Sequence, residues 1–194
     1  VFILLSDRPS RLLPTVRSRC QALRLGLPDP GQVLDWLMQR GHEREAAERA
    51  LLLGYGAPLT AAGLLEHDGL ASRDAVLLDL VALAAGRSGP LDVAANWQAL
   101  GAEWSLRWLA SLVNDMARLV LGATPDLLLH REHGAALQEC MSGLDSQRVL
   151  AMASAVEHTA RARAQRTGFN EPLMLEALAI DLHRCVSAGV RIGV

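Results

Sequence analysis

EWSLRWLASLVNDMARLVL, residues 103–121, carries a clear helical pattern in this chain of 194 residues. Trp104, Trp108 and Leu112 recur at a spacing of four, and Leu119 continues the same stripe. An α-helix makes one turn every 3.6 residues, so side chains at this spacing share a face and can be buried together. The stretch therefore predicts a long amphipathic helix that packs against other helices.

Similar patterns continue on both sides of this stretch. Their starts carry helix-initiating residues such as Pro125, Asp145 and Asn170, which suit the first turn or the cap of a helix. From residue 71 onward the sequence predicts six helices, over residues 71–86, 91–100, 103–121, 125–141, 146–166 and from 170 toward the C-terminus. Six helices joined by short loops are typical of an all-α bundle.

Three shorter helices are expected before the bundle. Pro28, Pro30 and Gly31 break the pattern and mark a boundary. The first predicted helix then ends at Gly41, the second covers residues 43–53, and the third runs from Pro58 to about His67. Inward-facing positions in these helices are often alanine, which predicts a small, closely packed helical unit.

The N-terminal stretch has a different character. VFILL, residues 1–5, is a continuous apolar run that predicts a strand buried on both faces. Pro14 is expected to interrupt a short helical turn that begins at Ser10, and residues 15–25 could return to the sheet as an edge strand. Because the chain begins within a strand and without Met, we expect it to be a part of a longer protein.

Composition limits the chemistry that this chain can perform. The net charge is −2 and all 19 basic residues are arginine, so a P-loop lysine, a Schiff-base lysine and a Ser-Lys dyad are excluded. Cys20, Cys140 and Cys185 are far apart and form no C-x-x-C pair, which favours a reducing, cytoplasmic setting and neither disulfides nor a zinc site. No apolar run approaches the ~18–20 residues that span a bilayer.

Several residues in the predicted bundle are candidates for a binding site. His130 and His133 have a spacing that could hold a metal on a helix, but two ligands without a third favour exposed polar residues and predict no metal site. The tryptophans at 97, 104 and 108 are expected to be core anchors rather than base-stacking platforms. Arg161, Arg163 and Arg166 are expected to be solvated cations at a helix end, where the helix dipole favours them, with a local DNA contact as the alternative.

The most distinctive short string is LLPTVRSRCQ, residues 12–21, which follows the apolar run. Arg11, Arg17 and Arg19 surround the thiol of Cys20 there. A guanidinium is always charged and can donate to two oxygens at once, so an arginine on a turn behind a buried strand is suited to reach a phosphate held elsewhere.

This string, with Arg8-Pro9-Ser10 before it, resembles the Ser-Arg-Cys segment of the AAA+ clamp loader subunits of bacterial DNA polymerase III. In that family the arginine acts as a finger on ATP bound by the neighbouring subunit. The resemblance implies that Arg19 is the finger, that Ser18 and Cys20 are its structural neighbours, and that Ser6-Asp7 lies where the sensor strand ends. It implies no cofactor or metal bound by this part of the chain.

The resemblance covers nearly the whole chain. Residues 56–62, GAPLTAA, are similar to the start of the second-sensor helix of an AAA+ lid, where ATP-binding members carry an arginine in place of Leu59. Asn170, Leu173 and Glu176 resemble the final helix of the collar. The implied fold is all-α for most of the chain: a remnant of the AAA+ α/β core with one strand (1–27), a three-helix lid (28–70) and a six-helix collar bundle (71–194).

The loss of the lid arginine suits the family member that does not hydrolyse ATP and serves as the stator. The implied function is to assemble through the collar with the gamma/tau and delta subunits, and so to help load the sliding clamp on primed DNA in the cytoplasm. On its own the chain would not be an enzyme. The alternatives left open are an ATP-hydrolysing gamma/tau-type subunit and a helical interaction domain unrelated to ATP, for which the string is a chance match.

Overall fold

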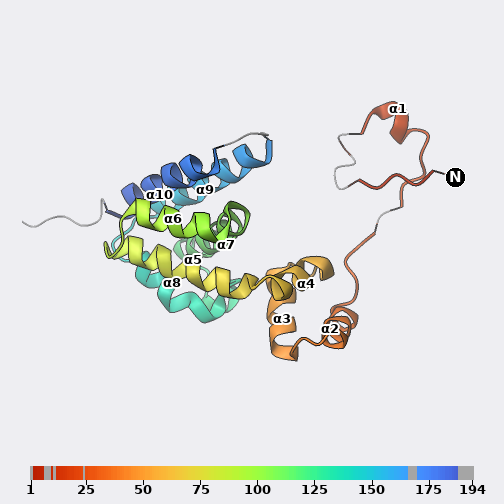
Figure 1. The fold of residues 1–194 in the computed structure, drawn as a ribbon, viewed down its shortest axis with the longest axis horizontal. Coiled ribbons are helices and arrows are strands. Elements are labelled where there is room, and N and C mark those ends of the chain that lie inside the picture. The colour runs from red at the N-terminus through yellow and green to blue at the C-terminus, as the bar shows by residue number, and fades with distance from the viewer. Residues whose placement is uncertain (1, 7–9, 11, 24, 166–169, 188–194) are drawn as a thin grey trace, which may run out of the picture.

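The computed structural model describes residues 2–6, 10, 12–23, 25–165 and 170–187, and its regular structure there is helical. Within these residues there is no β-strand, so the predicted all-α fold is confirmed for most of the chain. Figure 1 shows the order of the elements from the N-terminus to α10. The helices are α1 (Pro14–Arg17), α2 (Pro30–Gln39), α3 (Arg44–Leu53), α4 (Pro58–Glu66), α5 (Gly69–Ala84), α6 (Pro90–Leu100), α7 (Ala102–Val120), α8 (Gly134–Cys140), α9 (Ser146–Gln165) and α10 (Glu171–Ser187), with 3₁₀ turns η2 (Pro125–Leu127) and η3 (Arg131–His133) before α8.

Local sequence explains where several helices begin. Proline occupies the first position of α2, α4 and α6, where its missing N–H costs no hydrogen bond. The carboxylate of Asp145 accepts a hydrogen bond from the backbone N–H of Arg148 at 2.9 Å, and the side-chain oxygen of Asn170 accepts one from Leu173 at 3.1 Å. Both caps are those that the sequence predicted.

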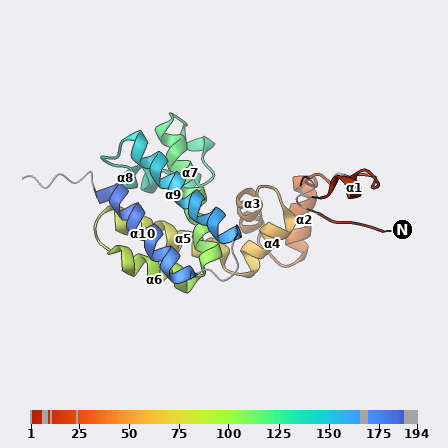
Figure 2. The same ribbon diagram turned by 90° about the horizontal axis from the view of Figure 1, so that it is seen from above.

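Helices α2, α3 and α4 form a small unit between the longer helices and the segment that carries α1 (Figures 1 and 2). Ala47, Ala50 and Ala61 are fully buried in it, as the pattern of alanines predicted. At Gly54 a Cβ atom would lie 3.0 Å from the backbone oxygen of Ala50, so the chain approaches itself too closely there for a side chain. The small residues thus let these short helices pack together.

The longer helices form a bundle on the other side of α4 (Figure 2). Helix α7 packs mainly against α9 and α5, and α10 packs against α6 and α9. Trp97 and Trp108 are fully buried among leucines, as expected for core anchors, and Trp104 stacks on Trp108 with ring centroids 6.2 Å apart. No helix in the described residues is long and apolar enough to cross a membrane.

Three local predictions were wrong. Residues 2–6 form no strand, because a strand needs a neighbour for its backbone hydrogen bonds and the described residues contain none. Residues 15–25 form no sheet edge where they are described, and α1 occupies part of this stretch, with Pro14 in its first turn, where proline is tolerated. The helix expected over residues 125–141 is broken into η2, η3 and α8.

Candidate functional site

The Ser18-Arg19-Cys20 string lies at the end of the short helix α1 (Figure 1). The backbone oxygen of Leu13 accepts hydrogen bonds from the N–H groups of Val16 and Arg17 at 3.0 and 3.1 Å, which closes the first turn. The Ser18 hydroxyl then donates to the backbone oxygen of Thr15 at 3.2 Å. Ser18 therefore tightens the turn from which Arg19 extends.

Arg19 itself is exposed. Its backbone N–H donates to the oxygen of Val16 at 3.1 Å, which continues the turn. Among the residues that the structure describes, its guanidinium makes no ion pair and no side-chain hydrogen bond, and the same holds for Arg17 two residues before it. Two cations are thus carried on one exposed turn, with their hydrogen-bonding capacity unused.

The segment that carries this turn is not packed into the helical body. Phe2 is 99% exposed and Leu5 is 88% exposed, and the hydrophobic core of the described residues begins only at Val33. A hollow of about 700 Å³ lies beside α1 and is lined by apolar side chains such as Leu12, together with Arg17. The arrangement can present a cation to an anion that another chain supplies, but it builds no enclosed site of its own.

The structure describes some, but not all, of the other residues on which the resemblance rests. Leu59 lies in the first turn of α4 and is 80% exposed, so an apolar side chain is presented at the position where the resemblance implies an arginine in ATP-binding members. Ser6 is described, while Arg8, Arg11 and Asp7 lie outside the described residues. The roles of Ser18, Arg19 and Cys20 stay predictions.

The two histidines considered for metal binding differ from expectation. They were predicted to be exposed on a helix, yet His130 is fully buried, and His133 lies in η3 with its Nε2 atom 3.1 Å from a carboxylate oxygen of Asp74. The reason is that the chain leaves helical geometry before residue 134 and turns the His130 ring inward, 3.0 Å from the hydroxyl of Ser111. No group of three potential ligands that could hold a metal is found in the described part of the chain.

Near these histidines lies an ionic cluster that the sequence reasoning missed, which we call the Arg73 cluster. Its members are Arg73, Asp74, Glu132 and His133. Arg73 is only 2% exposed, and its guanidinium lies 2.7 Å from Glu132 and 2.8 Å from Asp74. Burial alone would raise the pKa of Glu132, but a backbone hydrogen bond and the interaction with Arg73 outweigh it and lower the pKa.

A signal for this cluster was present in the sequence. Residues 73, 76, 77 and 80 lie on one face of a helix, and the last three are buried apolar residues. An arginine on such a face must be buried with its partners, because an unpaired charge is costly in an apolar environment. The position of Arg73 thus indicated an ion pair, although the partner 59 residues away could not be read from spacing.

The arginines near the end of α9 make local ion pairs. Arg161 pairs with Glu157 one turn earlier, and Arg163 lies 2.8 Å from Glu171 at the start of α10. Arg166 falls outside the described residues. Since the two described cations already have carboxylate partners, they support the expected solvated helix end more than a DNA contact.

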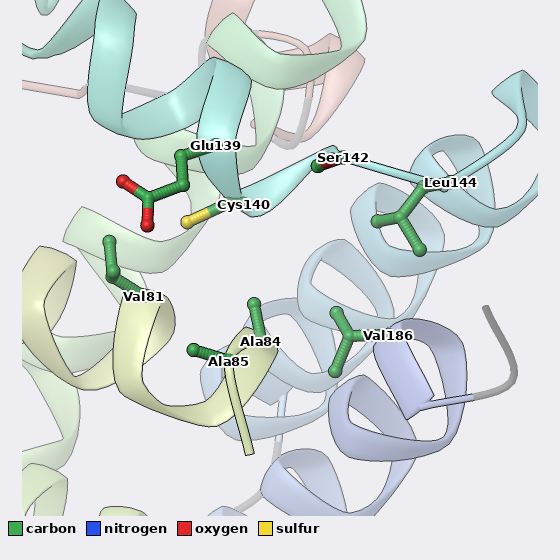
Figure 3. Close-up of a pocket in the computed structure, with 8 residues that line it drawn as sticks. All are labelled: Val81, Ala84, Ala85, Glu139, Cys140, Ser142, Leu144 and Val186. Carbon is green, nitrogen blue, oxygen red and sulfur yellow. The ribbon is translucent and has the colours of Figure 1, made fainter. Parts of the chain in front are cut away.

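A smaller hollow of about 250 Å³ lies between the ends of α5, α8 and α10 (Figure 3). Figure 3 shows Glu139 and Cys140 of α8 facing Val81 of α5, with Val186 of α10 on another side. Burial raises the pKa of the Cys140 thiol to about 12, so the sulfur stays protonated at neutral pH. The hollow therefore contains no activated nucleophile.

Comparison with known proteins gives a consistent result. Residues 67–184 match the family model described as "DNA polymerase III, delta subunit, C terminal". The chain is 28% identical over 190 residues to "DNA polymerase III subunit delta'" of Pseudomonas aeruginosa, in an alignment that covers 93% of this chain. It is also 28% identical over 201 residues to the protein of the same name from Escherichia coli, in an alignment that covers 97% of this chain. It spans 56% of the length of each relative.

Proposed function

The chain belongs to the family of the C-terminal region of the DNA polymerase III delta subunit, and from this premise we propose that it acts as a clamp loader subunit of the delta-prime type. Similarity to delta-prime proteins over 93% or more of the chain supports this assignment. The proposed task is to assemble with the gamma/tau and delta subunits, so that the loader can place the sliding clamp on primed DNA. Its place of action would be the cytoplasm.

The observation that carries the proposal is the exposed guanidinium of Arg19. A finger must reach a phosphate on another subunit, so it needs an exposed position and no carboxylate that holds it within its own chain. Arg19 has both properties within the described residues. In the assembled loader it would donate hydrogen bonds to the γ-phosphate of ATP held by the neighbour and stabilise the negative charge of the transition state.

The parts of the chain would divide this work. Residues 1–27 would belong to the AAA+ core, 28–70 to the lid, and 71–194 to the collar that holds the subunits together. The proposed lid carries Leu59 where ATP-binding members of the family have a sensor arginine. This position favours a subunit that assists hydrolysis in a neighbour over a gamma/tau-type subunit that hydrolyses ATP itself.

The test uses the full-length subunit in a reconstituted loader. Arg19→Ala should lower clamp-stimulated ATP hydrolysis and clamp loading, while assembly and the fold remain unchanged, because an exposed substitution usually shifts stability by no more than about 0.5 kcal/mol. Arg19→Lys should restore little, since a point charge does not replace the planar fork.

Arg17→Ala is the matched control, because Arg17 is also exposed on the same turn and makes no ion pair with any residue that the structure describes. Equal losses in the two variants would show a general need for positive charge rather than a finger at Arg19. Wild-type rates in the Arg19→Ala loader, with assembly confirmed, would refute the proposed role.

A further inference from the structure

The connection between α7 and α9, residues 121–144, is built differently from the rest of the bundle, and we call it the strap. It contains η2, η3 and α8 and lies along the outside of α5 and α7 (Figures 1 and 2). The long helices pack on one another through whole faces, whereas α8 is a short helix of seven residues. The strap therefore depends on a small number of attachments.

The first attachment is polar and joins the strap to α7. Asp115 is 1% exposed, and its carboxylate accepts hydrogen bonds from the backbone N–H groups of Leu129 at 3.1 Å and His130 at 2.7 Å. The imidazole Nε2 of His130 lies 3.0 Å from the Ser111 hydroxyl. One buried carboxylate and one buried hydroxyl thus hold the turn that precedes η3.

The second attachment is the Arg73 cluster, which joins the strap to the first turns of α5. The guanidinium of Arg73 connects Asp74 of its own helix with Glu132 of the strap, and His133 of the strap contacts the same Asp74 carboxylate. Because Arg73 is buried, its charge depends on these carboxylates for stabilisation.

Apolar attachment of the strap is limited. Leu128, Leu137 and Cys140 are its fully buried apolar side chains. Beyond Cys140, the hollow in Figure 3 lies between the end of α8 and the ends of α5 and α10, and Met141 and Leu144 pack against the core as partly buried side chains. The strap is thus held by polar contacts at the η3 end and by a small set of apolar contacts along α8 and just after it.

From this arrangement we infer that the strap releases from α5 and α7 as one unit while the long helices stay folded, and that the Arg73–Glu132 ion pair is the latch that holds it. Regions with few buried apolar contacts open at lower free energy than the core to which they attach. Removing the Glu132 charge weakens this attachment, because Glu132 is the strap's own carboxylate on the buried guanidinium and Arg73 then keeps only Asp74 of its own helix as an ion-pair partner among the described residues. Release would uncover the faces of α5 and α7 that the strap covers.

Hydrogen exchange of the full chain, measured peptide by peptide, tests this inference. In the wild type, amides of residues 128–140 should exchange faster than those of α7 and α10. Glu132→Gln should accelerate exchange of the strap severalfold, since it removes the strap's carboxylate from buried Arg73, while the partial exposure of Glu132 and the remaining Arg73–Asp74 pair keep the loss below that of a fully buried pair. Exchange in α9 and α10 should remain unchanged.

Glu157→Gln is the matched control, because it makes the same chemical change in an exposed ion pair of α9. It should leave exchange of the strap unaltered. Equal protection of the strap and the long helices in the wild type would overturn the inference without any variant. A Glu132→Gln protein whose exchange rises equally in all helices, or in none, would overturn the role of the latch.

Discussion

Acid should weaken this fold through His130, whose imidazole is buried between α7 and the strap. Burial lowers the pKa of His130 from 6.5 to about 4, because protonation would place a charge away from water, and nearby Asp115 only partly opposes the shift. In the unfolded chain the ring regains its ordinary pKa. Between pH 6.5 and 4 the unfolded state therefore binds a proton that the folded state does not bind. Stability is complete above this window and is lost as the pH falls through it.

The two pKa values correspond to a loss of about 2 kcal/mol between pH 7 and pH 5, and of about 3 kcal/mol below pH 4. The assay is urea unfolding followed by circular dichroism, at steps from pH 7 to pH 5, for the wild type and His130→Gln. The amide of glutamine can form hydrogen bonds but does not titrate. Groups that titrate in both proteins contribute equally to both, so they cancel in the difference between the two unfolding free energies.

At pH 7 the variant should be the less stable protein, because it loses packing at a buried position. At pH 5 the difference in unfolding free energy between the two proteins should have shrunk by about 2 kcal/mol. A difference that stays constant from pH 7 to pH 5 would refute the reasoning that His130 is buried and neutral in the folded chain.

Three further outcomes are expected. Gly69→Ala should lower the free energy of unfolding by about 1–3 kcal/mol in urea titrations, because the new Cβ would lie 2.8 Å from the Leu64 side chain and 3.0 Å from the Leu64 backbone. An unchanged urea midpoint would contradict this close approach. Asn170→Ala should cost about 1 kcal/mol in the same assay through loss of the α10 cap, whereas Asn170→Asp should retain most of it. At neutral pH an alkylating reagent should label exposed Cys20 long before buried Cys140, as mass spectrometry would show, and early labelling of Cys140 would mean that α8 is not seated as described.

Features that depend on nearby residues were predictable from the sequence. The caps at Asp145 and Asn170 involve backbone groups three residues away, so the pattern contains both partners. Burial of Trp97 and Trp108 followed from helical periodicity. Such features fix the order and the approximate ends of most helices, and with them the all-α fold.

Features that depend on distant partners were not predictable in the same way. The apolar residues 2–5 have strong strand propensity, yet they form no strand where described, because propensity cannot supply a neighbouring strand. The break before α8 follows from the burial of His130 and from the pairing of Glu132 with Arg73, two residues 59 positions apart. Helical periodicity over residues 125–141 contained no information about these contacts.

At the candidate site, too, the sequence predicted the local feature, and the structure was needed for its surroundings. Sequence alone singled out the Ser18-Arg19-Cys20 string, with Arg19 as the finger that the resemblance implies. The structure adds that Arg19 extends from a turn tightened by Ser18 and is exposed on a segment outside the core. Its phosphate would come from another subunit, so its action can be tested only in the assembled loader.

The most direct test is the single-turnover rate of ATP hydrolysis at the site next to this subunit, in a loader whose other ATP sites have been disabled. With Arg19→Ala in the full-length subunit, that rate should fall by a factor on the order of 10³ or more, which is typical of a lost arginine finger, while the subunits still assemble. An unchanged rate at this site, in a loader shown to be fully assembled, would contradict the claim that Arg19 acts on a neighbour's ATP.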